Sequence, residues 1–346
     1  MATAAQRRIK SVSYAKYGYI FILPFFIVYF IFSLYPLIQT FILAFQSNGA
    51  RTNLSFVGLD NFKTILATPA EGDYKAMGIH EEFWKYMKNT VIIWVGNFIP
   101  QIALSLLLAV WFTDLRVKMP GKGFFKVVMY MPNIITAASV AGLFLSLFGD
   151  SPYSVINMLR GCADPNKSVE PLTLINGVWS SRILVMFIQV WMWFGNTMIM
   201  LMSGIQGINE SLFEAAEIDG ANTHQTFWRI TFPLLKTIMV YTLLTSMIGG
   251  LQMFDIPFML HHGTVIRDDI ATVAVFIYQK FHANFTRPQF GYSAAASVIL
   301  FCITSVLGAL VFYVQRDKDA IELNKKRKAA RKEAQRKAAR GGGFSI

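Results

Sequence analysis

Six apolar segments without charged residues constrain this chain more than any other feature of its sequence. A helix needs roughly 17 to 25 such residues to cross the hydrocarbon core of a bilayer. Hydrocarbon offers no partner to an exposed amide, so each segment must pair its own backbone groups, as a helix does. The sequence therefore predicts an all-α membrane protein with six transmembrane helices. The predicted spans are 17–45, 90–112, 127–148, 183–203, 237–254 and 290–314.

The composition agrees with a membrane protein and leaves one charged region. The chain has 346 residues, of which 54% are hydrophobic and 15% are charged, a combination that soluble domains rarely show. Its net charge is +12. The segment 316–346 alone carries 11 Lys and Arg against 4 Asp and Glu, which is +7. We expect this basic tail to bind anionic membrane lipid. Nucleic acid is not an expected partner, because the tail has no aromatic platform.

The basic residues also predict the orientation of the spans. Lys and Arg gather in the N-terminal segment 1–16, between spans two and three, and in the tail, whereas the segments 46–89, 149–182 and 255–289 mix both signs. The positive-inside rule then places both termini in the cytoplasm. It places the segment between spans four and five there as well. The domain prediction is a cytoplasmic N-terminus at 1–16, a membrane domain at 17–315 and a cytoplasmic tail.

The segment 204–235, between spans four and five, has strong signals of local structure. Ser211 and Glu214 have the spacing of a capping box, which predicts that Ser211 caps a short helix over Leu212–Asp219. Gly220 suits the left-handed position that follows the last residue of such a helix. Thr223 can cap a second helix, which we expect to end before Pro233. These signals predict a helix-turn-helix.

The same segment resembles the EAA loop of the membrane subunits of binding-protein-dependent ABC importers. The match covers Glu214, Ala215, Ala216, Asp219, Gly220, Ala221, Phe227, Ile230 and Pro233 at the expected spacing. The segments 204–208 and 291–297 are similar to the MalF-like carbohydrate branch of that family. A generic cytoplasmic hairpin with good caps is the alternative interpretation of the segment.

The resemblance implies a function and a set of partners. The chain would be the permease subunit of an ATP-driven importer in a bacterial or archaeal cytoplasmic membrane, for a sugar or oligosaccharide that an extracytoplasmic binding protein delivers. It would pair with a second, different permease subunit. Two cytoplasmic ATPase subunits would bind ATP and Mg and hold the loop residues Glu214, Ala215, Ala216, Asp219 and Gly220 in a cleft. The chain itself has no Walker A sequence, so we expect neither enzyme activity nor a bound cofactor.

Polar residues in the spans are candidates for the solute path. Gln189, Trp193 and Asn196 share one face of span four, and Gln252 and Asp255 share one face at the end of span five. Amides and carboxylates bond sugar hydroxyls, and an indole packs on the C–H face of a sugar ring. Interhelical hydrogen bonding explains the same amides equally well. By resemblance, Asp255 belongs to a Phe-Asp pair that the family carries after this span.

Other functions remain open at this level. An ion-coupled secondary transporter would need intramembrane coupling carboxylates and usually broken helices or paired repeats. Asp255 alone meets this requirement poorly. A subunit that imports a non-sugar solute and a membrane scaffold that binds a cytoplasmic partner are further alternatives. The two cysteines, Cys162 and Cys302, suggest neither a disulfide nor a metal site.

Overall fold

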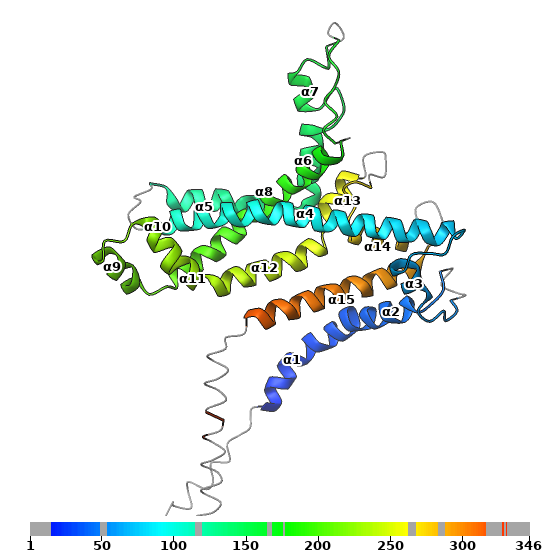
Figure 1. Ribbon diagram of the computed structural model, residues 1–346, viewed down its shortest axis with the longest axis horizontal. Helices are drawn as coiled ribbons and strands as arrows, with labels where there is room; N and C mark the ends of the chain where they lie inside the picture. The colour runs from blue at the N-terminus through cyan, green and yellow to red at the C-terminus, as the bar shows by residue number, and fades with distance from the viewer. Residues whose placement is uncertain are drawn as a thin grey trace, which may run out of the picture. The chain divides into compact units, whose positions relative to one another are not determined.

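The computed structural model describes residues 15–48, 54–114, 120–164, 168–175, 177–261, 268–282 and 288–315, together with 327, 328 and 330. The segment 1–14 and most of the basic tail 316–346 lie outside the described residues, so the expectations for them stay predictions. All the regular elements of the described part are helices (Figure 1), and its one β pairing is an isolated bridge between Gln46 and Phe56. The all-α prediction is confirmed.

The α-helices and the shorter helical turns follow one another along the chain (Figure 1). The α-helices are α1 (Ala15–Tyr29), α2 (Tyr35–Ala44), α3 (Asp60–Leu66), α4 (Tyr74–Thr113), α5 (Lys122–Tyr130), α6 (Ala137–Phe148), α7 (Val155–Leu159), α8 (Val178–Gln206), α9 (Glu210–Ile218), α10 (Thr223–Thr226), α11 (Phe232–Leu234), α12 (Lys236–Leu251), α13 (Asp255–His261), α14 (Val273–His282) and α15 (Phe290–Gln315). Two π-helical turns span Phe30–Leu34 and Phe227–Thr231, and a 3₁₀ turn spans Met131–Ile134.

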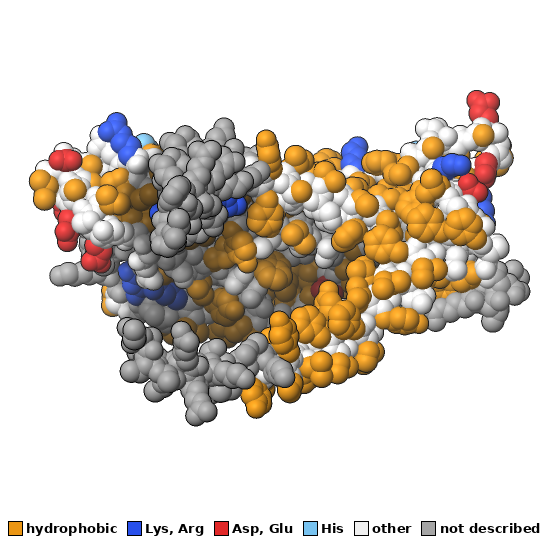
Figure 2. Space-filling model, turned by 90° about the horizontal axis from the view of Figure 1, so that it is seen from below, with side chains coloured by type: hydrophobic (Ala, Val, Ile, Leu, Met, Phe, Trp, Pro, Cys, Tyr) orange, Lys and Arg blue, Asp and Glu red, His pale blue; other side chains and the backbone are white. Residues whose placement is uncertain are grey.

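Five helical segments of the described chain are long and apolar enough to cross a membrane. They are Tyr17–Ala44, Tyr74–Thr113, Val178–Gln206, Lys236–Leu260 and Phe290–Tyr313. A sixth is counted only if the bent pair formed by α5 and α6 is one span. On the face shown in Figure 2, apolar side chains cover most of the helix surfaces. The first of these segments buries no residue of its most apolar stretch, as expected for a helix that meets lipid or another subunit.

The prediction of a single helix over 127–148 is wrong, because the chain turns by 94° between α5 and α6. Pro132 lies in the 3₁₀ turn, and Ile135 is extended. Thr136 then begins a new helix, since its side chain accepts a hydrogen bond from the Ser139 amide at 3.4 Å. Pro132 has no N–H with which to continue the α5 helix, and Thr136 is the N-cap of α6. Residues next to the bend therefore stabilise it on both sides.

The chain divides into two compact units. The first unit comprises Met1–Lys85 and Val273–Leu300. Here the side chain of Asn61, in α3, donates to the carbonyls of Ala44 (2.9 Å) and Gln46 (2.7 Å) at the end of α2. Asn48 bonds Asn61 and also accepts the amide of Tyr292 at 2.9 Å. The backbone oxygen of Gln46 lies where a Cβ of residue 291 would be, so the close approach of α15 requires Gly291.

The second unit, Tyr86–Thr272 and Phe301–Ile346, contains the packed bundle of α8, α12 and the later part of α4. Gln101 of α4 donates to Thr197 of α8 at 2.8 Å, and Ser105 donates to the carbonyl of Phe194 at 2.8 Å. At Gly195 the backbone of Met129 occupies the space of a Cβ, so α8 and the end of α5 touch main chain to main chain. Such contacts between small and polar residues hold helices together in the absence of water.

A network of polar side chains joins three segments of the second unit near Val178, at the N-terminal end of α8. Arg182 donates to Asn89 of α4 at 2.7 Å and to the carbonyl of Asp269 at 3.0 Å. Asn89 in turn donates to the carbonyls of Asp268 and Ala271. This network fixes the segment that follows α13 against both long helices.

Candidate functional site

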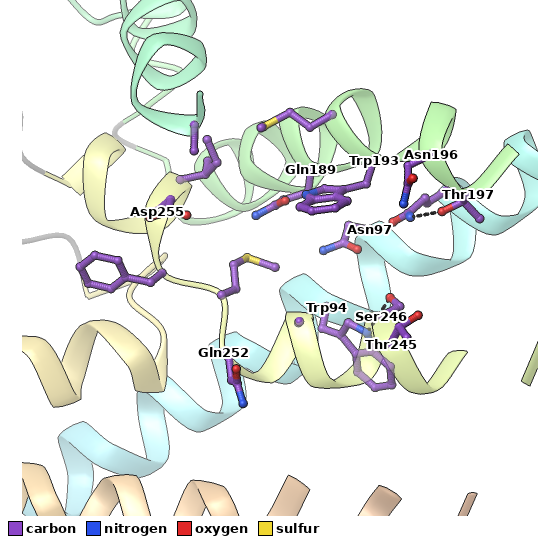
Figure 3. Close-up of a pocket in the computed structure, with 18 of the residues that line it drawn as sticks. Trp94, Asn97, Gln189, Trp193, Asn196, Thr197, Thr245, Ser246, Gln252 and Asp255 are labelled. Atoms are coloured by element: carbon purple, nitrogen blue, oxygen red, sulfur yellow. Dashed lines mark hydrogen bonds between the residues drawn. The ribbon is translucent and has the colours of Figure 1, made fainter. Parts of the chain in front are cut away.

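A cavity of about 320 Å³ lies in the second unit between α4, α8, α12 and the start of α13 (Figure 3). Its lining is mainly polar and aromatic. The polar and aromatic members are Trp94, Asn97, Gln101, Gln189, Trp193, Asn196, Thr197, Thr242, Thr245, Ser246, Gln252, Phe254 and Asp255. All five residues that the sequence predicted for the solute path are among them. The structure therefore brings the five predicted residues together around one cavity.

The residues of α8 line the cavity from one face, as their spacing predicts. Gln189, Trp193 and Asn196 all belong to the lining. Trp193 is 46% exposed, and Figure 3 shows its indole beside Gln189 and directed into the space between the helices. Gln189 is largely buried at the edge of the same space. An exposed indole with amides on either side is the arrangement that the sequence predicted.

Gln252 and Asp255 line the same cavity, but the prediction that they share one helix face is wrong. Helix α12 ends at Leu251, and Asp255 is the first residue of α13. The Gly249-Gly250 pair weakens the helix just before this break. The break frees the carbonyl of Met253, which accepts a hydrogen bond from the Thr272 hydroxyl at 2.6 Å. The chain can therefore leave the helix here without an unpaired buried carbonyl.

The polar side chains of the described bundle fall into two groups: some join helices to one another, and others line the cavity. Gln101 is bonded to Thr197 and so joins two helices. In contrast, the structure gives no hydrogen bond within the described chain to the side chains of Gln189, Asn196 or Gln252, which line the cavity. Both interpretations of the span amides therefore apply, each to different residues. The amides of the cavity are the ones available to a solute or to water.

Trp94 is a cavity residue that the sequence interpretation missed. Its indole nitrogen donates to the Ser246 hydroxyl at 3.3 Å, and its ring lies where a Cβ of Gly250 would be. Helix α4 and helix α12 therefore approach closely at this point, and Gly250 leaves room for the ring. The spacing of Trp94, Asn97 and Gln101, at i, i+3 and i+7, was the available signal for a shared polar face of α4.

The segment between α8 and α12 is a helix-turn-helix, but its first cap differs from the prediction. Helix α9 begins at Glu210, and Asn209 is its N-cap, with its side chain accepting the Ser211 amide at 3.1 Å. The predicted capping box at Ser211 and Glu214 is wrong, because Asn is an equally good cap and the helix begins earlier. Glu214 consequently lies in the middle of α9 and is exposed.

The end of α9 agrees with the prediction for Gly220. Gly220 has φ +74°, the left-handed conformation. The Gly220 amide donates to the carbonyl of Glu217 at 3.1 Å, and the Ala221 amide donates to the carbonyl of Ala216 at 2.9 Å. These two bonds form a Schellman motif, which closes a helix and needs a residue that tolerates positive φ.

The second helix of the loop differs from the prediction at both ends. Its cap is Asn222, not Thr223, in a capping box with Gln225 whose two bonds measure 2.8 and 2.9 Å. The helical run then continues through Pro233 instead of ending before it. A π turn precedes the proline, and in it the Phe232 amide donates to the carbonyl of Phe227. The wider turn accommodates a residue that has no N–H and crowds the preceding turn.

Most of the loop residues named from the sequence lie on the surface. Glu214, Ala215, Asp219 and Gly220 are exposed, whereas Ala216 is buried. Ile218 is 86% exposed beside them. A second cavity, of about 490 Å³, separates α9 from the ends of α4 and α8 and from the start of α5. Helix α9 therefore contacts the rest of the unit sparingly and presents an open face.

Comparison with known proteins assigns the class. Residues 76–319 match the family described as "Binding-protein-dependent transport system inner membrane component". The chain belongs to this family, and it is a multi-pass membrane permease subunit rather than an enzyme. Membership also sets aside the ion-coupled transporter and the scaffold as alternatives.

Individual relatives extend over nearly the whole chain. The chain is 30% identical to the arabinooligosaccharides transport system permease protein AraP of Bacillus subtilis, over 89% of this chain and 92% of AraP. It is 27% identical to the lactose transport system permease protein LacF of Rhizobium radiobacter, over 92% of this chain and all of LacF. In fold it resembles a subunit of a bacterial alginate ABC transporter, solved with an alginate-pentasaccharide-bound periplasmic protein. The TM-score is 0.71 at 21% identity, over 90% of this chain and 97% of that one.

The packing of Trp94 against α12 generates a testable prediction. Gly250→Ala places a methyl group in the space of the Trp94 ring. Such overpacking should lower the free energy of unfolding by about 1–3 kcal/mol. Gly249→Ala is the matched control, because nothing lies within 4 Å of its Cβ and alanine favours the helix. Thermal unfolding of the purified complex should therefore begin at a lower temperature in the first variant only. Equal midpoints for both variants would show that the contact does not form.

Proposed function

We propose that this chain is one of two membrane subunits of an ATP-driven importer for a sugar or oligosaccharide. The observation that supports it is the cavity, where the amides of Gln189, Asn196 and Gln252 and the indole of Trp193 meet in one lining. Amides are paired donors and acceptors, which match sugar hydroxyls. The indole offers an apolar face to ring C–H groups while its edge stays polar. The sugar assignment draws further support from the solutes that AraP and LacF are named for.

We propose that ATP binding and hydrolysis in the partner subunits act on this chain through the α9 loop. Two partner ATPases would bind ATP and Mg and receive α9 in a helix-in-groove contact, with Ala215 and Asp219 on its open face and Glu214 at the cavity behind it. The cavity behind α9 leaves room for that helix to move. Helix α8 joins the two sites, since it runs unbroken from the solute cavity at Asn196 to Gln206, about 15 Å further along its axis. A shift of the loop can then reach the cavity as a rigid-body motion.

The orientation and the remaining partners belong to the same proposal. The binding protein would deliver solute on the outer side, and both termini and the α9 loop would lie in the cytoplasm, as the Lys and Arg distribution predicts. A second, different permease subunit would complete the path. The exposed apolar surface of the first span, with Phe21 83% and Phe32 74% exposed, is suited to lipid or to that subunit. The basic tail would contact anionic lipid.

The coupling role of the loop predicts the effect of a single methyl group. Gly220→Ala imposes a left-handed cost of about 1–2 kcal/mol, because φ is +74° there, and it should redirect the second helix. Gly207→Ala is the control, since Gly207 is a glycine next to the same loop with φ −80° and only ordinary contacts at its Cβ. In reconstituted complex, Gly220→Ala should lower solute uptake per ATP hydrolysed, whereas Gly207→Ala should leave that ratio near wild type. Wild-type coupling in both variants would remove the loop from its proposed role.

The solute path predicts a difference between two substitutions of Trp193. Trp193→Ala removes the stacking surface and should abolish uptake, while Trp193→Phe keeps an aromatic face and should retain a good part of it. Expression and basal ATPase activity should stay near normal in both, because Trp193 is 46% exposed and lines the cavity instead of packing in the core. Uptake into vesicles with the complete complex is the measurement. Normal uptake by Trp193→Ala would place the path elsewhere, and failure of both variants to assemble would make this face a helix interface.

A further inference from the structure

The charges around the solute cavity restrict what kind of sugar it accepts. This inference rests on the proposed function and deepens it. We propose that the cavity takes neutral or cationic saccharides and excludes anionic ones, and that Asp255 is the residue that sets this preference. The relatives leave the question open, because AraP and LacF are named for neutral saccharides and the alginate transporter for an acidic polysaccharide. The lining of this chain supplies the distinction.

The described lining contains one ionisable side chain. Asp255 is that residue, and the described lining includes no Lys, Arg or His. Its carboxylate is exposed at the first residue of α13. The other polar members are amides, hydroxyls and indoles, which carry no charge. The lining that the described chain contributes is therefore neutral apart from one negative charge.

Arg182, the basic residue of α8 that precedes the lining residues, does not offset the negative charge of Asp255. Arg182 lies seven residues before Gln189, or about 10 Å along the helix axis. Its guanidinium is bonded to Asn89 and to the carbonyl of Asp269, and it stacks over Trp179 at 5.1 Å. The carboxylate of Asp268 accepts a bond from Tyr86 beside the same network. The surroundings of the cavity at this end therefore add the Asp268 carboxylate as well as the Arg182 guanidinium.

The effect on a solute follows from the cost of moving charge out of water. A uronate or phosphate group in this cavity would lose hydration, would find no cation in the lining that the described chain contributes and would be repelled by Asp255. A protonated amino group would pair with Asp255 instead. A neutral saccharide meets neither effect and is bound by the amides and indoles. We expect a neutral saccharide to bind about tenfold more tightly than its anionic counterpart of equal length.

Matched saccharide pairs separate the effect of charge from the identity of the solute. The first pair is α-1,4-linked tetragalacturonate and the galactose tetramer of the same linkage. The second pair is the glucosamine tetramer and its N-acetylated form, which differ chiefly in positive charge. Each is titrated against the complete importer in nanodiscs, and binding is followed by calorimetry. The ratio of dissociation constants within a pair measures the charge preference and cancels most of the effect of stereochemistry.

Asp60→Asn is the control for Asp255→Asn, because each aspartate is the first residue of a seven-residue helix and is exposed. In wild type and in Asp60→Asn, the uronate should bind about tenfold more weakly than galactose tetramer, and the amino sugar at least as well as its acetylated form. Asp255→Asn should bring the uronate ratio at least threefold closer to one and remove any advantage of the amino sugar. Equal or tighter binding of the uronate by wild type, or unchanged ratios in Asp255→Asn, would overturn the charge preference. Absence of binding by all four saccharides would overturn the preference as well, and the sugar assignment is tested separately by the uptake of the Trp193 variants.

Discussion

The requirement that every backbone amide and carbonyl be paired away from water governs this structure. Long helices meet it directly, and several departures from a regular helix in the described chain have a device that restores the pairing. Pro36 and Pro233 each follow a π turn in which an amide reaches the carbonyl five residues earlier. Thr136 caps the helix that begins after the 94° bend. Thr272 pairs the carbonyl of Met253 where α12 stops. The solute cavity depends on this last device, because the break is what brings Asp255 to its edge.

The same requirement divides the polar side chains of the bundle into two groups. Gln101 and Ser105 join α4 to α8, and Asn89 and Arg182 join both to the segment after α13. These bonds keep the walls of the cavity in place. The amides of Gln189 and Asn196 are left to face its interior. A rigid frame with a few unengaged polar groups is what a binding site needs, because little ordering remains to be done when a ligand arrives.

Much of the fold could be predicted from the sequence because the bilayer imposes a simple length and polarity rule. That rule identified the apolar spans and, with helical periodicity, the face of Gln189, Trp193 and Asn196. It did not identify the bend at Pro132, although Pro132 and Thr136 were local signals for it. It could not identify the break at Gln252, because that break depends on a tertiary partner, Thr272. The caps at Asn209 and Asn222 were missed because Ser211 and Thr223, close by, are also good caps. Trp94 was missed because its place is defined by contact with Gly250 across the bundle.

We propose that the rigid-body motion of α8 opens the solute cavity to opposite sides of the membrane in turn as the α9 loop moves. Reactivity of a cysteine in that cavity tests it most directly. Asn196→Cys, in a chain whose Cys162 and Cys302 are replaced, is exposed to a membrane-impermeant thiol reagent in sealed vesicles carrying the whole complex. The account predicts reaction from the cytoplasmic side without nucleotide and from the opposite side when the ATPases are trapped with ATP. Reaction from the same side in both states, or from neither side in either state, would contradict it.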